Sequence, residues 1–460
     1  MLADTRDFEN RIAGQESVLQ RFFDSPAPVT LTRAPGGLDV FGGIADYSGS
    51  LVAEATIGEA IRVALQPRKD SLVRVWSRDA GSPGHTAEAP LDRIFSNSET
   101  LASDPASRRA AYVLGCYSVL WKNKLLPDDI RGANIVVEGS IPASAGLSSS
   151  AALEVATLQA IAGAYGLALD AEKVAVLAQR VDHAVGGAPC GIMGPMASAL
   201  GEPGQLLLIL CQPHSVQGFS ELPKGVRIFG VHSGVNHSDA GASSARARIA
   251  AFMGRKLIND RRKSRGEEPL TYLCQLSPTR YRRDHAPSLP GKMSGQEFLE
   301  AVGDHEDPAT KIAAETLYPV RAATEHAVYE HGRVKTFLNC MDEAGQSNAS
   351  RQTIALIKAG VAMYGSHWSY TRIGLGARET TILTRLAREA GPSKGVFGAK
   401  ITGCGSGGVV AMLTNGDDAE ESIAEIAAEY ARLTGNDACI VEAGKSPGAA
   451  AFGCRTLVLA

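Results

Sequence analysis

The sequence has no long apolar run. Its longest uninterrupted apolar stretches, such as residues 206–211, are only as long as a strand, so none is long enough to cross a membrane as a helix. Residues 1–24 alternate charged and apolar residues and lack the apolar core of a signal peptide. The sequence therefore predicts neither a membrane span nor entry into a secretory route.

Two further absences concern charge and cysteine pairing. The net charge of -3 argues against a dedicated nucleic-acid-binding protein, and the basic tract at residues 246–265 alternates with apolar residues as a solvated helix face does. The eight cysteines form no CxxC pair and show no metal-ligand spacing, so we expect reduced thiols. These features predict a cytoplasmic protein that binds neither membranes nor nucleic acids.

The order of predicted elements is mixed, which indicates an α+β fold in two lobes. Strand-like runs dominate up to about residue 230, helical periodicity dominates residues 241–390, and a hairpin, a helix and a strand follow. We predict an N-terminal extension over residues 1–26, an N-terminal domain over 27–220 and a C-terminal domain over 221–460. The polar, proline-containing segment 264–290 is predicted to be a surface excursion.

The most informative segment is residues 142–152, PASAGLSSSAA, which lies between a predicted strand and an amphipathic helix. Small residues that open a helix leave backbone N–H groups unpaired, with the positive end of the helix dipole behind them. This arrangement suits the phosphates of a nucleotide, although a serine-rich cap of an ordinary helix is the alternative. The candidate nucleotide-binding residues are Pro142, Ala145, Gly146, Leu147, Ser148, Ser149, Ser150 and Ala151.

This segment resembles the second signature of the GHMP small-molecule kinases, and two more signatures follow the expected order. Residues 33–50, RAPGGLDVFGGIADYSGS, resemble the first signature, and residues 400–408, KITGCGSGG, resemble the third. Residues 187–193, GAPCGIM, are similar to a galactokinase motif. Within the galactokinase-like branch, the form GGIADYSGS is most similar to the kinase domain of L-arabinokinases, and the resemblance covers residues 27–460.

The resemblance implies a two-lobed fold, a substrate class and a set of ligands. The N-terminal lobe is expected to be like domain 2 of ribosomal protein S5, and the C-terminal lobe to be ferredoxin-like. The expected cofactors are ATP and Mg²⁺, and the expected partner is a small sugar or sugar-like substrate. Carried over residue by residue, the metal ligands are Ser150, or Ser149, and Asp182. The substrate-binding residues are Asp46, Gly43, Tyr47, Gly403 and Gly405.

Each of the two carboxylates has a plainer alternative. Asp182 is one methylene shorter than the glutamate usual in the family, so it could hold the metal through a water, or it could be a solvated helix residue. Asp46 matches the carboxylate that grips sugar hydroxyls, but an aspartate in this setting also caps turns.

The sequence departs from the family at the reacting centre. Gly37 stands where the kinases have an arginine that stabilises the transferring phosphoryl group, and Gly194 stands where they have the aspartate that orients or deprotonates the acceptor. His232 replaces an aspartate, Ser244 a tyrosine and Cys404 a glycine. We expect these small residues to leave room in the acceptor pocket. His232 is the first candidate for a replacement catalytic group, with a structural histidine as the alternative; Asp39, Arg33, His183 and Asp182 are others.

Three functions follow from an intact phosphate loop beside an altered reacting centre. The first is ATP-dependent phosphorylation of a sugar or sugar-like hydroxyl, with a substrate other than galactose or arabinose. The second is a pseudokinase that binds nucleotide, sugar or both as a regulator. The third is an enzyme of another class that reuses the fold.

Overall fold

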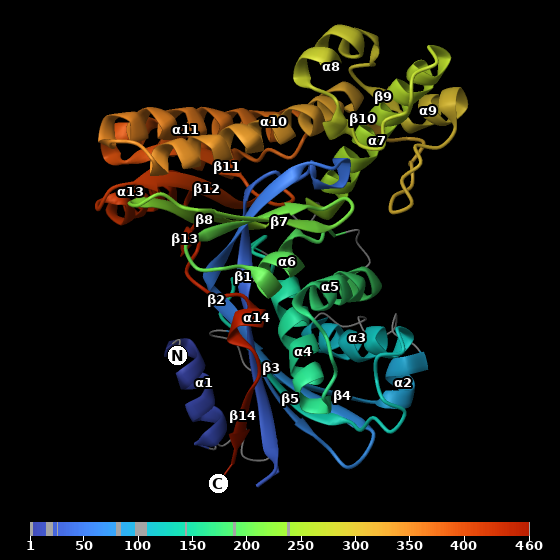
Figure 1. Ribbon diagram of the computed structural model, residues 1–460, viewed down its shortest axis with the longest axis vertical. Coiled ribbons are helices and arrows are strands. Elements are labelled where there is room, and N and C mark those ends of the chain that lie inside the picture. The colour runs from blue at the N-terminus through green and yellow to red at the C-terminus, as the bar shows by residue number, and fades with distance from the viewer. Residues whose placement is uncertain are drawn as a thin grey trace.

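The computed structural model describes residues 3–14, 22–24, 26–79, 84–96, 108–142, 145–186, 190–236 and 240–459. The chain forms two lobes stacked along the long axis of the molecule, and both marked chain ends lie in the lower lobe (Figure 1). Each lobe is built around its own sheet, of eight and four strands. This arrangement agrees with the two-lobed α+β fold predicted from the sequence.

The eight-stranded sheet of the lower lobe runs in the order β14-β1-β2-β5-β3-β4, with β6 paired to β2 and β7 paired to β6. The pair of β3 and β5 is parallel, and β1 and β2 pair antiparallel. The strands are β1 Pro28–Phe41, β2 Leu51–Pro67, β3 Leu72–Asp79, β4 His85–Pro90, β5 Ala133–Gly139, β6 Gln205–Leu210, β7 Ser215–Glu221 and β14 Arg455–Val458.

Helices cover both faces of this sheet because its central strands are apolar on both sides. In β5, Ile135 and Val137 face the large core beneath the main helices, while Val136 faces Phe8 and Ile12 of α1. The predicted N-terminal extension thus contains a helix that packs on the sheet. The helices are α1 Ala3–Ala13, α2 Leu91–Ser96, α3 Arg108–Lys122, α4 Ser149–Tyr165, α5 Ala171–Gly186, α6 Met193–Leu200 and α14 Ala449–Phe452.

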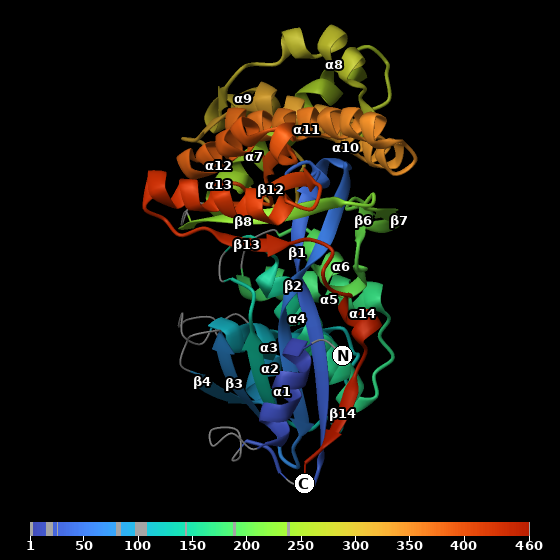
Figure 2. The same ribbon diagram turned by 90° about the vertical axis from the view of Figure 1, so that its left-hand side faces the viewer.

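The upper lobe contains a four-stranded antiparallel sheet in the order β11-β12-β8-β13. Taken in chain order, its strands are connected as strand, helices, hairpin, helix and strand, which is the ferredoxin-like pattern. Figure 2 shows this sheet between the lower lobe and the helices that cover it. The strands are β8 Val226–Asn236, β11 Val396–Ile401, β12 Gly407–Asn415 and β13 Cys439–Glu442.

The helices of the upper lobe pack on the far side of this sheet and around α7. Within the described ranges, none of the helices combines the length and apolarity that crossing a membrane requires. The helices are α7 Ala240–Ser264, α8 Pro278–Asp284, α9 Gly295–Val302, α10 Val320–Gly345, α11 Ala349–Arg372, α12 Arg378–Ala390 and α13 Ala419–Thr434, and a small ribbon pairs β9 Met293–Ser294 with β10 Leu317–Tyr318.

The first signature connects the two lobes. β1 continues through the glycines of the signature, with register shifts at Pro35/Gly37 and Asp39/Phe41. The loop after β1 rises toward α7 and carries the short 3-10 helix η1 Asp46–Ser48 (Figure 1). There Ile44 and Tyr47 join the apolar core of the upper lobe.

The segment 264–290 is not the plain surface excursion that its polarity predicted. It holds α8 and two 3-10 turns, η4 Leu273–Gln275 and η5 Ala286–Ser288. Leu273, Tyr281 and Leu289 are buried against α7 and its neighbours. In the sequence, the many charged residues of this segment obscure the few apolar residues that pack into the core.

The end of the chain returns to the lower lobe. β14 pairs antiparallel with the start of β1, from Pro28 opposite Val458 to Leu31 opposite Arg455. The predicted boundary near residue 220 falls between strands of different sheets, since β7 belongs to the lower sheet and β8 to the upper one. The division into three segments at residues 26 and 220 stays a prediction.

Gly360 allows α11 to lie directly on β11. A Cβ atom at this position would lie 1.8 Å from the carbonyl oxygen of Phe397. We expect Gly360→Ala to lower the free energy of unfolding by about 1–3 kcal/mol, because helix and strand must separate. Gly365→Ala on the same helix is the control, since its Cβ would meet only Arg333 Nε at 3.4 Å. Equal urea denaturation midpoints for the two variants would contradict this packing.

Candidate active site

A cavity of about 430 Å³ opens between the lobes at the N-terminus of α4. Both glycine-rich signatures and the ends of β1 and β2 contribute to it. Its described lining residues are Asp39, Glu54, Ala145, Gly146, Leu147, Ser148, Ser149, Ser150, Ala151, Asp182, Cys190, Gly191, Met193, Gly194, Pro195, Thr402, Gly403, Cys404, Gly405, Ser406, Gly407, Gly408 and Val409. Pro142 is not among them, so the cavity contains seven of the eight predicted nucleotide-binding residues.

The phosphate loop takes the backbone conformation expected for anion binding. Gly146 and Ser148 have left-handed φ values of 75° and 57°, and Ser148 caps α4 without a hydrogen bond from its side chain. The side chain of Ser148 is thus free for other partners, and the first N–H groups of α4 point out of the helix. Residues 143–144 of this signature and 187–189 of the galactokinase-like motif lie outside the described residues.

The two predicted metal ligands lie together. The Ser150 Oγ donates to Asp182 Oδ2 at 3.4 Å, and the Tyr112 hydroxyl donates to Asp182 Oδ1 at 3.2 Å. A hydroxyl and a carboxylate are hard oxygen ligands, which Mg²⁺ accepts beside water and substrate phosphates. The residues present therefore fit the expected metal, and the role of Asp182 as its ligand stays a prediction.

Glu154 is a buried acid that the sequence analysis missed. It lies one turn after Ser150, and neither of its carboxylate oxygens has a hydrogen-bond partner. Burial, with Asp182 nearby, raises the pKa of Glu154 well above its usual value. Its sequence signal was a lone acid in the otherwise apolar face of α4.

The substrate-binding prediction divides into two groups. Gly403 and Gly405 line the cavity, while Asp46, Gly43 and Tyr47 lie behind its wall. A Cβ on the lining residue Gly191 would lie 2.8 Å from Asp46 Oδ2, so Asp46 directly backs the wall. Burial raises the pKa of Asp46 to about 6, although Arg248 opposes this shift. Tyr47 instead packs on Phe252 of α7.

Gly43 makes room for a different acid. A Cβ on Gly43 would lie 2.3 Å from Asp39 Oδ2 and 2.6 Å from the Tyr370 hydroxyl. Asp39 Oδ2 accepts the N–H of Gly403 at 2.9 Å and lies 3.5 Å from Lys400 Nζ. Lys400 is fully buried, with the rings of Phe41 and Tyr370 beside its ammonium group. Asp39 therefore anchors the third signature.

Glu54 is the second buried acid that sequence reasoning missed. It lies opposite Asp39 in the register of β1 and β2, is 2% exposed, and its Oε2 atom has no hydrogen-bond partner. Burial raises the pKa of Glu54 well above its usual value, and Asp39 raises it further while Lys400 opposes them. An acid inside an apolar strand was the signal, but its neighbours become visible only in the sheet.

The positions that lack the family's arginine and aspartate lie on either side of Ser148. A Cβ on Gly194 would lie 2.6 Å from Ser148 Oγ, and one on Gly37 would lie 3.3 Å from the same oxygen. The expected room is therefore partly taken up by the Ser148 side chain. Two other replacements lie close enough to interact: burial raises the pKa of the Cys404 thiol, and Ser244 opposes this shift.

His232 and Arg33 do not reach the cavity. His232 lies on β8 between Val409 and Cys439, is 8% exposed, and accepts the N–H of Gly234 through Nδ1. The pairing of β8 on both sides encloses it, so the structure does not place the candidate catalytic histidine at the reacting centre. Arg33 bonds to Asp4 and Ser446 in the lower lobe, where it has a structural role.

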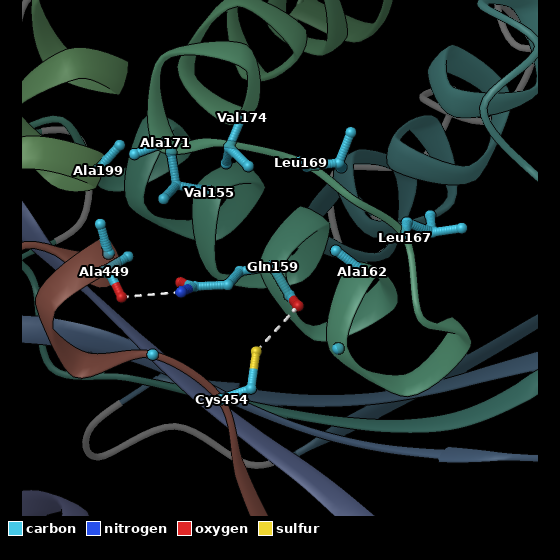
Figure 3. A pocket seen from close by; sticks show the side chains of 13 residues that line it. Val155, Gln159, Ala162, Leu167, Leu169, Ala171, Val174, Ala199, Ala449 and Cys454 are labelled. Carbon is cyan, nitrogen blue, oxygen red and sulfur yellow. Dashed lines mark hydrogen bonds between the residues drawn. The ribbon is translucent and has the colours of Figure 1, made fainter.

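A second cavity of about 340 Å³ lies beside α4 and the chain segment of α14, away from these acids. Figure 3 shows its largely apolar lining, with Gln159 bonded to the carbonyl of Ala449 and Cys454 bonded to the carbonyl of Gln159. Among its described lining residues there is no acidic or basic side chain, whereas the cavity between the lobes is lined by Asp39, Glu54 and Asp182.

Comparisons with known proteins agree with this fold. The family model for the GHMP kinases N terminal domain matches residues 111–202. The chain is 35% identical to an Arabidopsis thaliana L-arabinokinase over 97% of this chain and 48% of that protein. It is 29% identical to a Chloroflexus aggregans galactokinase over 91% of this chain and 92% of that protein. A solved Lactococcus lactis galactokinase complexed with galactose aligns with a TM-score of 0.72 and 21% identity, covering 99% of this chain and 100% of that one.

The chain has the GHMP kinase fold, and it carries the N-terminal domain of that family over residues 111–202, as its signatures predicted. The alignment with the solved galactokinase shows that the two chains share this fold. The chain spans about half the length of the L-arabinokinase that it matches.

We expect Gly194→Ala to weaken Mg-ATP binding about tenfold, because its Cβ would displace Ser148 and with it the phosphate loop. Gly37→Ala is the matched control, since its Cβ meets the same Ser148 Oγ at a tolerable 3.3 Å. Isothermal titration calorimetry of both variants checks this difference. Unchanged affinity in Gly194→Ala would mean that Ser148 does not hold the loop in its binding conformation.

A second expectation concerns pH. Because the pKa of Asp46 is raised to about 6, its contribution to stability is present below about pH 4 and is lost as the pH rises through 6. Asp46→Asn should therefore exceed the wild type in free energy of unfolding by about 2–3 kcal/mol at pH 8, a difference that vanishes near pH 4.

Urea denaturation at pH 8, 6 and 4 measures this effect. Asp70→Asn serves as the control, because a hydrogen bond from Arg68 lowers the pKa of Asp70 to about 2. Its effect on stability should be flat between about pH 5 and pH 8. A flat profile for Asp46→Asn as well would show that Asp46 is ionised without penalty.

Proposed function

We propose that this chain is an ATP-dependent kinase that transfers a phosphoryl group to a hydroxyl of a sugar or sugar-like molecule. The observation that carries this proposal is the phosphate loop at the N-terminus of α4, with Ser150 and Asp182 beside it in the same cavity. The L-arabinokinase and galactokinase relatives support the substrate class. The free state of all eight cysteines is consistent with a cytoplasmic setting.

Phosphoryl transfer depends mainly on positioning and charge stabilisation, and the chain offers groups for both. The N–H groups of residues 148–151 and the dipole of α4 would hold the nucleotide phosphates. Ser150 and Asp182 would hold Mg²⁺, which when bound neutralises charge on the phosphates. The third-signature loop closes the cavity from the upper lobe and excludes water around the phosphates.

The acceptor should differ from free galactose and free L-arabinose. The family's arginine and aspartate are glycines here, and the Ser148 side chain takes part of their space. Asp39 and Glu54 add carboxylates at the acceptor end of the cavity instead. We propose an acceptor that is bulkier or less polar than a free pentose, bound near these two acids.

One observation favours a pseudokinase as the second candidate. Among the described lining residues, the charged side chains are Asp39, Glu54 and Asp182, and none is an arginine or lysine. Loss of a charge-stabilising arginine typically costs about 10³-fold or more in phosphoryl transfer. A chain that binds Mg-ATP without transferring its phosphoryl group would then act through binding alone.

The nucleotide site can be tested through its metal ligand. Ser150→Ala should weaken binding of Mg-ATP about tenfold and leave binding of ATP in EDTA nearly unchanged, because the lost contact is to the metal. Ser96→Ala, on the short helix α2 outside the cavity, is the matched control. If millimolar Mg-ATP produces no thermal shift in the wild type, the assignment of the site is wrong.

Turnover then separates the kinase from the pseudokinase. Wild-type protein with Mg-ATP is assayed for ADP release against D-galactose, L-arabinose, D-glucose, D-mannose and myo-inositol. Sugar-dependent ADP release supports the kinase, and Mg-ATP binding without it supports the pseudokinase. Micromolar binding of free galactose or L-arabinose would contradict the altered acceptor specificity.

A further inference from the structure

Two buried acids face each other across β1 and β2 at the wall of the cavity. Asp39 and Glu54 are register partners, and they are 4% and 2% exposed. One oxygen of each carboxylate, Asp39 Oδ1 and Glu54 Oε2, is buried without a hydrogen-bond partner. An unpaired buried carboxylate oxygen costs free energy, so a site of this kind calls for a functional explanation.

The two acids differ in how they are held. Asp39 is fixed, because its Oδ2 accepts the N–H of Gly403 and lies beside Lys400 Nζ. Among the described residues, no donor bonds to Glu54 Oε2. The ammonium group of Lys400 lies near both carboxylates. The other titratable groups near Glu54 are Asp46 and Cys211. Glu54 is therefore the member of the pair that is free to exchange a proton.

Glu54 also lies close to Gly37, one of the two positions where the family has a catalytic arginine or aspartate. A carbon placed on Gly37 would lie 3.4 Å from Glu54 Oε2 and 3.3 Å from Ser148 Oγ. The same Ser148 oxygen would lie 2.6 Å from a carbon on Gly194, where the family has its aspartate. The carboxylate of Glu54 and the phosphate loop thus flank one point, which is where an acceptor hydroxyl would meet a transferring phosphoryl group.

We propose that Glu54 is a relocated catalytic base, which takes the proton of the acceptor hydroxyl in place of the missing aspartate. This inference rests on the proposed kinase function. The acceptor oxygen forms a bond to the γ-phosphorus of ATP, the bond from that phosphorus to the β–γ bridging oxygen breaks, and ADP leaves. The hydroxyl proton passes to Glu54, which later releases it to water. Asp39 and Lys400 act as positioning residues.

The electrostatics of the pair suit this role. Burial first, and then Asp39, raise the pKa of Glu54, which brings a carboxylate closer to the proton affinity that a base needs near neutral pH. The base works when it is deprotonated. The rate of transfer should therefore rise with pH through the raised pKa of Glu54 and fall on the acid side.

The test compares Glu54→Gln with Glu59→Gln, both on β2. Glu59 also has a buried, unpartnered carboxylate oxygen and a pKa raised by burial, but it lies outside the cavity near Arg33. Each variant is titrated with Mg-ATP by calorimetry, which also confirms folding. Each is then assayed for ADP release with the same five acceptors, and with water alone, between pH 5 and pH 9.

We expect Glu54→Gln to lower kcat by about 10²- to 10⁴-fold, to keep its affinity for Mg-ATP within about threefold, and to lose the acid limb of the pH profile. Glu59→Gln should keep both the rate and the limb. Wild-type turnover and an intact acid limb in Glu54→Gln would overturn the role of Glu54 and leave the kinase proposal standing. Wild-type protein that binds Mg-ATP yet transfers to no acceptor overturns both.

Discussion

The carboxylate of Asp39 is the contact on which the geometry of the site depends. Asp39 lies on β1 in the lower lobe, and it holds the N–H of Gly403 and the ammonium group of Lys400 from the upper lobe. Lys400 is fully buried, so it requires an anion close by; removing one partner of such a pair typically costs about 3–5 kcal/mol. This one pairing sets how the third signature meets the phosphate loop.

The two glycine-rich loops touch because neither carries side chains at the contact. A Cβ on Gly408 would lie 3.3 Å from the carbonyl oxygen of Ala145, and one on Gly403 would lie 3.7 Å from that of Gly146. Backbone therefore faces backbone across the cavity, which leaves space for phosphates and little for water. The arrangement leaves the carboxylate of Glu54 less well stabilised than that of Asp39. The ammonium group of Lys400 lies near both carboxylates, and among the described residues only Asp39 accepts a further hydrogen bond.

The departures from the family are physically coupled. Gly43 leaves the volume that Asp39 and Tyr370 occupy, and Gly194 leaves the volume that Ser148 occupies. A side chain placed at Gly43 or Gly194 would thus collide with these neighbours. We interpret this pattern as a repacked acceptor site. In this interpretation the carboxylates of Asp39 and Glu54, on the sheet, replace the family's arginine and aspartate.

Local patterns in the sequence determined the phosphate loop, the three signatures and helices such as α3 and α4, because 3.6-residue periodicity and glycine-rich turns act over short distances. The family resemblance paired Ser150 with Asp182. Only the tertiary structure shows that Glu54 lies opposite Asp39 and that the side chain of Ser148 takes up part of the space beside Gly37 and Gly194. It also shows that His232 is not among the described residues lining the cavity. Those relations depend on strand register and on contacts between separate elements, which leave no periodic signal in either segment.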